Sequence, residues 1–102
     1  MKQVELQKIL QEHALWLKGD GEKGKYANLQ GAKLQGADLQ GADLQGADLE
    51  GADLRRAKLR KADLQWAKLQ EADIQEAKLR EAKLERAVIW KDEVTWVLTL
   101  DK

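Results

Sequence analysis

A five-residue repeat occupies the middle of this 102-residue chain and constrains its fold more than any other feature. Alanine recurs at every fifth position from Ala27 to Ala87, and leucine or isoleucine follows two residues later, from Leu29 to Ile89. Thirteen repeats follow one another without a gap. Self-similarity at a fixed period predicts a solenoid, in which each repeat packs against its neighbours. Such a scaffold specifies a surface and not a reaction.

A period of five fits neither an α-helix nor an uninterrupted strand. A helix would spread the leucines around its whole circumference, and a strand would place Leu29 and Leu34 on opposite faces. Within one repeat, Ala27 and Leu29 point the same way, as on a short extended segment, so a corner must follow each repeat. Glycine, which a tight turn accepts most readily, precedes the alanine at Gly31, Gly36, Gly41, Gly46 and Gly51. The sequence predicts a coil whose sides are single repeats.

The repeats resemble those of a known family. Residues 37–41, Ala-Asp-Leu-Gln-Gly, resemble the A-(D/N)-L-x-x motif of pentapeptide-repeat proteins almost letter for letter. The resemblance implies an all-β solenoid, a right-handed quadrilateral β-helix of about three coils with four repeats per coil. It also implies leucine along the axis and alanine in the wall. A disordered low-complexity tract is the alternative. In such a tract the apolar positions would be interrupted, whereas here every repeat keeps them.

Residues 1–25 are predicted to form an N-terminal capping helix and a connector, because a solenoid must cover its open ends. One face at helical spacing over residues 3–17 carries Leu6, Ile9, Leu10, His13, Trp16 and Leu17. Gly19 is a natural stop for this helix. Residues 13–17, His-Ala-Leu-Trp-Leu, resemble the leader of many cyanobacterial members of the family.

The repeat region is assigned to residues 26–91, and residues 92–102 to a C-terminal cap or a dimerisation segment. Val94, Trp96, Leu98 and Leu100 alternate with Thr95, Val97 and Thr99, as in a half-buried strand. A cap is the simpler interpretation. However, Trp90, Trp96 and Val97 are more apolar than an isolated cap requires, which favours a weak homodimer through this C-terminal edge.

The sequence has few residues of the types that catalysis, cofactor binding or metal binding requires. It has no cysteine and no serine, and its single histidine, His13, shares the apolar face of the leader, as a packed residue would. The aspartates of the repeats would lie on successive sides of the coil and could not converge on one ion. We expect no enzymatic activity and no cofactor. No apolar run approaches a membrane span and no signal peptide is evident, so a soluble, cytoplasmic protein is expected.

Charge is unevenly distributed although the net charge is zero. Residues 26–53 carry five acidic side chains against one lysine, whereas residues 54–91 carry eleven basic and six acidic ones. Such polarity can steer association, and drifting composition is the plainer explanation. With four repeats per coil, one face would gather Lys58, Arg60, Lys61, Lys78 and Arg80. Trp66 would point outward beneath Arg86 in a cation–π pair, with a structural role favoured over binding.

The leading hypothesis is a non-enzymatic scaffold for protein–protein interaction with an unidentified partner. The candidate interaction surface consists of Lys58, Arg60, Lys61, Lys78, Arg80, Trp66, Trp90 and Trp96. Family resemblance also raises the fluoroquinolone-resistance branch, which resembles B-DNA and occupies the DNA site of gyrase. That mimicry needs a long, dimeric, strongly acidic rod, unlike this chain. Weak nucleic-acid binding through the basic face is the other alternative, but five cations in a neutral protein are a weak footprint. The regular repeats would also suit an engineered consensus protein, whereas the leader and tail are idiosyncratic.

Overall fold

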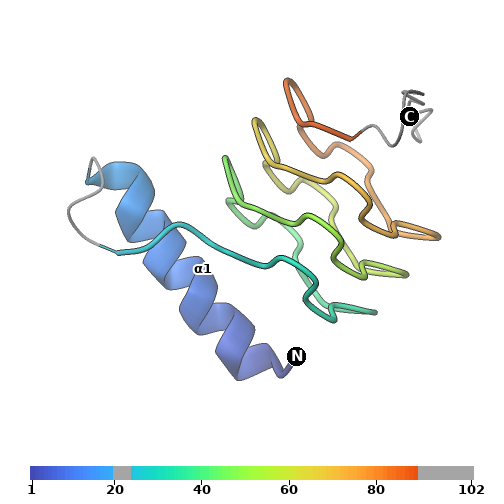
Figure 1. The fold of residues 1–102 in the computed structure, drawn as a ribbon, viewed down its shortest axis with the longest axis horizontal. Helices are drawn as coiled ribbons and strands as arrows, with labels where there is room; N and C mark the ends of the chain where they lie inside the picture. The colour runs from blue at the N-terminus through green and yellow to red at the C-terminus, as the bar shows by residue number, and fades with distance from the viewer. Residues whose placement is uncertain (20–23, 90–102) are drawn as a thin grey trace.

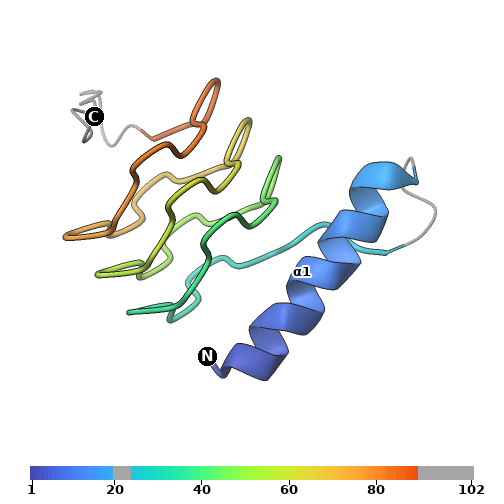
Figure 2. The same ribbon diagram turned by 180° about the vertical axis from the view of Figure 1, so that it is seen from behind.

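The structure, a computed structural model, describes residues 1–19 and 24–89. Within these residues one helix, α1 (Gln3–Lys18), precedes a coiled wall that is built from the five-residue repeats and climbs away from the helix (Figure 1). The view from behind shows the same order, with α1 across the N-terminal end of the stack (Figure 2). The helix predicted over residues 3–17 is confirmed.

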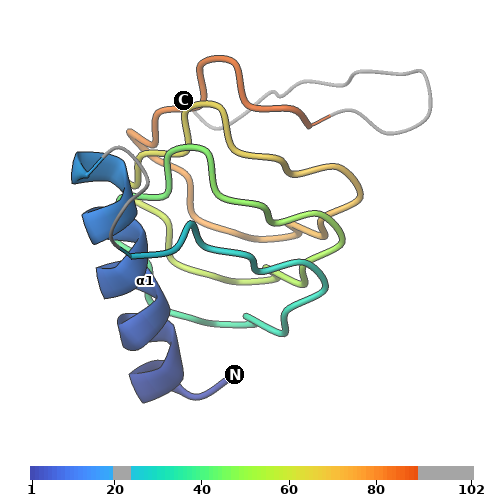
Figure 3. The same cartoon turned by 60° about the vertical axis from the view of Figure 1, so that its left-hand side comes forward.

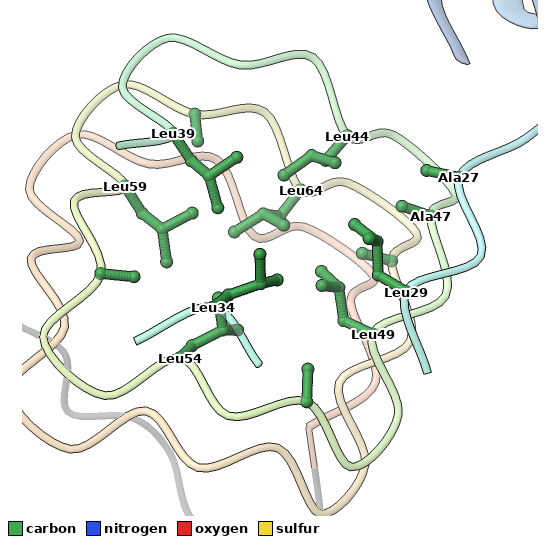
Figure 4. Packing of buried hydrophobic residues seen from close by; sticks show 14 of the residues in the cluster. Ala27, Leu29, Leu34, Leu39, Leu44, Ala47, Leu49, Leu54, Leu59 and Leu64 are labelled. Atoms are coloured by element: carbon green, nitrogen blue, oxygen red, sulfur yellow. The ribbon is translucent and has the colours of Figure 1, made fainter. Parts of the chain in front are cut away.

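Backbone pairing fixes twenty residues per coil. Parallel bridges join residues twenty apart, from the pair Asn28 and Asp48 to the pair Lys68 and Val88. In residues 24–89 no strand extends beyond a single bridged residue, because each side of the coil is one repeat long. Four repeats therefore complete one coil, whose outline is four-sided (Figure 4).

Backbone hydrogen bonds tie each coil to the next and close each corner. The N–H of Leu29 donates to the carbonyl of Asp48 at 2.7 Å, and the N–H of Asp48 donates back to Ala27 at 3.0 Å. At the corner, the N–H of Ala32 donates to the carbonyl of Leu29 at 3.0 Å. Gly31 takes φ of 64° in this turn, the left-handed conformation that glycine adopts without strain. The predicted position of the corner is confirmed.

Leucine fills the axis and alanine forms the wall. Figure 4 shows Leu39 and Leu59 facing Leu29 and Leu49 across the centre of the coil. Leu64 is only 1% exposed, and the leucines from position 29 to position 64 are all buried. At the C-terminal end of the described coils, partly buried side chains line an apolar opening: Ile74, Leu79, Leu84 and Ile89.

Helix α1 covers the N-terminal end of the axis. Leu6 is 1% exposed and joins the leucine core, with Ile9 packed beside it. The terminal ammonium of Met1 donates to the carbonyl of Lys33 at 2.8 Å, so the helix is fastened to the first coil (Figure 3). The helix ends at Lys18 and is capped by Gly19, the predicted stop, although with φ of −106° this residue does not take the left-handed form.

The segment 92–102, for which a cap or a dimer contact was predicted, lies outside the described residues, as do Trp90 and Trp96. Within residues 1–19 and 24–89, no helix has the length and apolarity to cross a membrane.

Candidate functional site

The first and third residues of each repeat point inward, which leaves the other three for the surface. Repeats 37–41, 57–61 and 77–81 stack on one side of the coil, called here the basic face. Its cations are Lys58, Arg60, Lys61, Lys78 and Arg80, and its carboxylates are Asp38 and Glu81. The structure therefore brings together all five basic residues that the sequence predicted for one surface.

The cations of the basic face are not neutralised by ion pairs. Among the described residues, none of the five has a carboxylate oxygen within 4.0 Å. Backbone pairing places Lys58 between Asp38 in the coil below and Lys78 in the coil above. The neighbours Lys58 and Lys78 carry like charges, which is unfavourable by itself. A negatively charged surface brought to this face would relieve that repulsion.

A shallow hollow lies at one corner of the basic face, lined by Gln40, Gly41, Arg60 and Lys61. Gly41 has φ of 67°, and no heavy atom lies within 4 Å of the place where a Cβ would stand. The frame of the hollow is fixed, because the N–H of Gly41 donates to Arg60 at 2.8 Å and that of Lys61 to Arg80 at 3.0 Å. Two cations and one amide thus border an open space.

The side opposite the basic face is acidic. Repeats 27–31, 47–51 and 67–71, called here the acidic face, lie two sides away around the coil (Figure 4). Their charged residues are Glu50 and Glu71 against Lys68, together with Asp48, whose carboxylate is buried and accepts hydrogen bonds from Gln30 and Glu50. The order of charges in the sequence predicts polarity along the axis of the coil. The structure shows that the charges are also separated across it.

The shortest ion pair among the described residues lies on a neighbouring side. Arg55 donates from Nε and Nη2 to the two carboxylate oxygens of Asp53, at 2.8 and 2.7 Å. This side-chain hydrogen bonding lowers the pKa of Asp53 and raises the pKa of Arg55. Arg55 is therefore already paired, unlike the cations of the basic face.

Aspartates at the second position of the repeat serve the backbone, a role that the sequence analysis missed. The carboxylate of Asp38 accepts the N–H of Gln40, and that of Asp73 accepts the N–H of Gln75, each at 3.2 Å. These contacts explain why the motif uses Asp or Asn, whose short side chains form such turns. In the described ranges, no cluster of three or more histidine or acidic side chains could hold a metal ion.

His13 is fully buried and joins α1 to the first coil. Its Nδ1 accepts the N–H of Ala27 and its Nε2 donates to the carbonyl of Gln45, both at 2.8 Å. In later repeats the alanine N–H donates to the carbonyl of the leucine three residues earlier, as Ala32 does to Leu29. Both ring nitrogens of His13 thus replace backbone partners that a preceding coil would supply. The predicted packed role is confirmed, and the imidazole has no nitrogen left for a metal or a substrate.

Trp66 is the most exposed aromatic side chain among the described residues, at 60%. The guanidinium carbon of Arg86 lies 5.0 Å from its ring centroid, so the predicted cation–π pair is confirmed. Trp16 lies elsewhere, stacked on His13 with centroids 5.5 Å apart. Trp90 and Trp96, the other tryptophans of the candidate surface, fall outside the described residues.

Comparisons with known proteins agree with this architecture. The family model for pentapeptide repeats matches residues 25–60 and 47–86, with 8 copies of the repeat. Among curated proteins no match was found. The chain is similar to the solved structure of the pentapeptide-repeat protein Rfr23 from the cyanobacterium Cyanothece 51142. The two share 37% identity with a TM-score of 0.61, over 63% of this chain and 44% of that one.

A second similar structure is HetL from the cyanobacterium Nostoc sp. PCC 7120, a pentapeptide-repeat protein involved in regulating heterocyst differentiation. The identity is 46% and the TM-score 0.60, over 63% of this chain and 30% of HetL. This chain therefore spans less than half the length of either solved structure.

Proposed function

Because the chain belongs to the pentapeptide-repeat family, we propose that it is a non-enzymatic scaffold that binds a partner protein through the basic face. Proteins of this family fold as right-handed quadrilateral β-helices, which offer flat sides. The observation that carries the proposal is the group of five cations on one such side, without an ion pair among the described residues. Charges of this kind steer association and select a partner of opposite sign.

Rigidity of the basic face supports this proposal. Lys58 and Lys78 lie on backbone segments that are paired to each other, so their Cα positions are fixed before a partner arrives. Binding to such a surface orders side chains but not backbone, which lowers the entropic cost of association. Arginine in particular can bind a carboxylate through two parallel N–H groups, and Arg60 and Arg80 stack one coil apart on this face.

The residues that could act as catalytic acids or bases have structural roles, which supports a non-enzymatic function. His13, the single histidine, is buried with both nitrogens bonded to backbone. The repeat aspartates such as Asp38 and Asp73 accept hydrogen bonds from turns. These groups stabilise the fold through hydrogen bonds to the backbone. We therefore assign the function to a surface that contacts another protein. The named role of HetL in regulation fits a protein of this family that acts by contact.

Two alternatives to the scaffold function involve nucleic acids, and each has a direct experimental test. A DNA mimic should inhibit supercoiling by DNA gyrase, and we expect no inhibition at micromolar concentration, because the exposed basic face is opposite in sign to DNA. Dose-dependent inhibition would replace the scaffold proposal by mimicry. Binding of a short DNA duplex through the basic face would instead weaken steeply with salt.

Affinity capture from a lysate of the source organism tests the proposal itself. The variant Lys58→Glu/Arg60→Glu reverses two charges on the basic face, and Lys68→Glu/Lys83→Glu makes the same net change on two other sides. We expect a protein that is captured by the parent and by the control variant but lost by the basic-face variant. Equal retention by both variants, with cooperative melting of each, would show that another surface binds.

A further inference from the structure

We infer that the hollow at the Gly41 corner anchors a carboxylate of the partner, and that the partner's docking segment is a short acidic segment in extended conformation. This inference rests on the proposed function and adds the chemistry of the ligand. Gln40, Arg60 and Lys61 line the hollow together with Gly41. The Nε2 of Gln40 already donates to the carboxylate of Asp38 at 3.3 Å, so the two cations are the charged donors that a ligand would meet. A carboxylate is the group that such a set of donors recognises.

The missing side chain at Gly41 creates the site. The next coil carries Lys61 at the same corner and the coil after it carries Glu81, so Gly41 is the one bare position in this described column. Because a Cβ at Gly41 would meet no heavy atom within 4 Å, the space beside the backbone is open. Arg60 and Lys61 thus line a gap in the side-chain layer.

Carboxylates at the margins of the basic face limit the length of the ligand. Asp38 lies in the coil below Lys58, and Glu81 lies in the coil above Lys61. The acidic face covers the opposite side of the coil. A long polyanion such as DNA would extend over these negative charges, whereas an acidic segment a few residues long fits between them.

Spacing of the cations fits an extended peptide. Lys58 lies on the side of the coil, and Arg60 begins the corner turn two residues later, which separates their Cα atoms by at most about 6.6 Å. In an extended peptide, alternate residues project to the same side with this same spacing of about 6.6 Å. Acidic residues at alternate positions would therefore place one carboxylate near Lys58 and the next in the hollow between Arg60 and Lys61.

The test uses a peptide of glutamate alternating with threonine, and the same peptide with glutamine in place of glutamate. Gly41→Asp would place an internal carboxylate in the hollow, where it competes with the ligand. Gly41→Asn is the matched control, because Asn and Asp have similar size and both tolerate the left-handed conformation. Gly36→Asp adds the same charge at a corner that does not border the hollow.

We expect the glutamate peptide to bind the parent chain and the glutamine peptide not to bind, by isothermal titration at low salt. Gly41→Asp should weaken binding about fivefold, the size expected for one partly exposed carboxylate pair, while Gly41→Asn and Gly36→Asp change it less than twofold. Equal weakening by Gly41→Asp and Gly36→Asp would show that only net charge matters and would overturn the anchor.

Three further outcomes test this inference and separate it from the proposed function. Loss of peptide binding by both Gly41→Asp and Gly41→Asn would point to a backbone effect and overturn the carboxylate anchor. Tighter binding of a short DNA duplex than of the glutamate peptide would overturn the acidic-protein ligand. If the parent binds no glutamate peptide but still captures a partner that the basic-face variant loses, the inference is wrong while the scaffold function stands.

Discussion

The early repeats, residues 27–51, and the later described repeats, residues 52–89, share one backbone but differ at their corners. Glycine occupies every corner of the early repeats, with φ between 64° and 72°. Charged residues or tryptophan occupy the corners of the later ones, with φ between 60° and 67°. The left-handed conformation costs a residue other than glycine about 1–2 kcal/mol. The later repeats therefore bear a strain that the early repeats avoid.

This difference shows that the coil, and not glycine, imposes the corner geometry. Hydrogen bonds from one coil to the next are the same in both regions, such as Gly36 to Arg55 and Arg56 to Gln75, each at 2.9 Å. The strained corners of the later repeats carry side chains that glycine lacks, and these side chains lie on the surface. Lys61 contributes to the basic face, and Trp66 forms the cation–π pair with Arg86. The early repeats contribute the open corner at Gly41.

The largest expected effect tests whether the two regions share one core. Leu44→Asp in the early repeats and Leu64→Asp in the later ones should each prevent folding, because both leucines are buried and an unpaired carboxylate on the axis costs several kcal/mol. Circular dichroism during heating gives the measurement, with Leu64→Met as the conservative control. A cooperative melt of Leu64→Asp near the parent temperature would show that Leu64 is not inside.

Replacement of His13 should affect the early repeats more than the later ones. His13→Ala leaves the N–H of Ala27 and the carbonyl of Gln45 without their partner, and we expect unfolding free energy to fall by about 2–4 kcal/mol. Amide hydrogen exchange should accelerate first in the coil that α1 covers. Uniform acceleration through residues 62–86 as well would mean that the coil unfolds as one unit.

An exchange of corner residues tests the strain itself. Gly41→Ala should destabilise the protein by about 1 kcal/mol through backbone strain alone, because nothing lies near its Cβ position. Lys61→Gly, one coil above, should stabilise it by up to about 1 kcal/mol. Urea unfolding of both variants measures the difference. Two changes of the same sign would contradict an equal corner geometry in the two regions.

The cation–π pair should contribute little to stability. A double-mutant cycle of Trp66→Ala and Arg86→Ala is expected to give a coupling free energy of about 0.5–1 kcal/mol, as for an exposed pair. Chemical unfolding of the four proteins supplies the values. A coupling near zero would leave Trp66, at 60% exposure, as an unsupported aromatic and favour a binding role for it.

The smallest expected effect is weak self-association, which should leave the stability of the monomer unchanged. We propose a weak homodimer through the C-terminal edge, supported by the apolar opening that Ile74 and Leu84 help to line. Light scattering at high micromolar concentration should give a mass above that of the monomer, little changed by salt. The variant Trp96→Glu should restore the monomer mass. A monomer throughout, or a mass that falls on adding salt, would contradict the dimer.

Much of the candidate site could be predicted because it follows from register. Once four repeats make a coil, Lys58, Lys78 and their neighbours must share a side, and Arg86 must lie above Trp66. The pairing of individual charges could not be predicted in this way. Arg55 pairs with Asp53 in its own repeat, whereas Lys61 has no carboxylate within 4.0 Å in the described part of the chain. Exposed pairs differ by only about 0–1 kcal/mol, so rotamers and neighbours decide them.

By itself the sequence determined the solenoid, its leucine axis, its corners and the position of α1. The apolar pattern is repeated thirteen times, and each buried leucine contributes about 1.5–3 kcal/mol, so no local preference can compete with it. Only the tertiary structure decided that His13 supplies the missing backbone partners of the first coil, and that the space at Gly41 lies open beneath Lys61. Both depend on where groups distant in sequence meet after the coil has closed, and a five-residue pattern carries no information about such meetings.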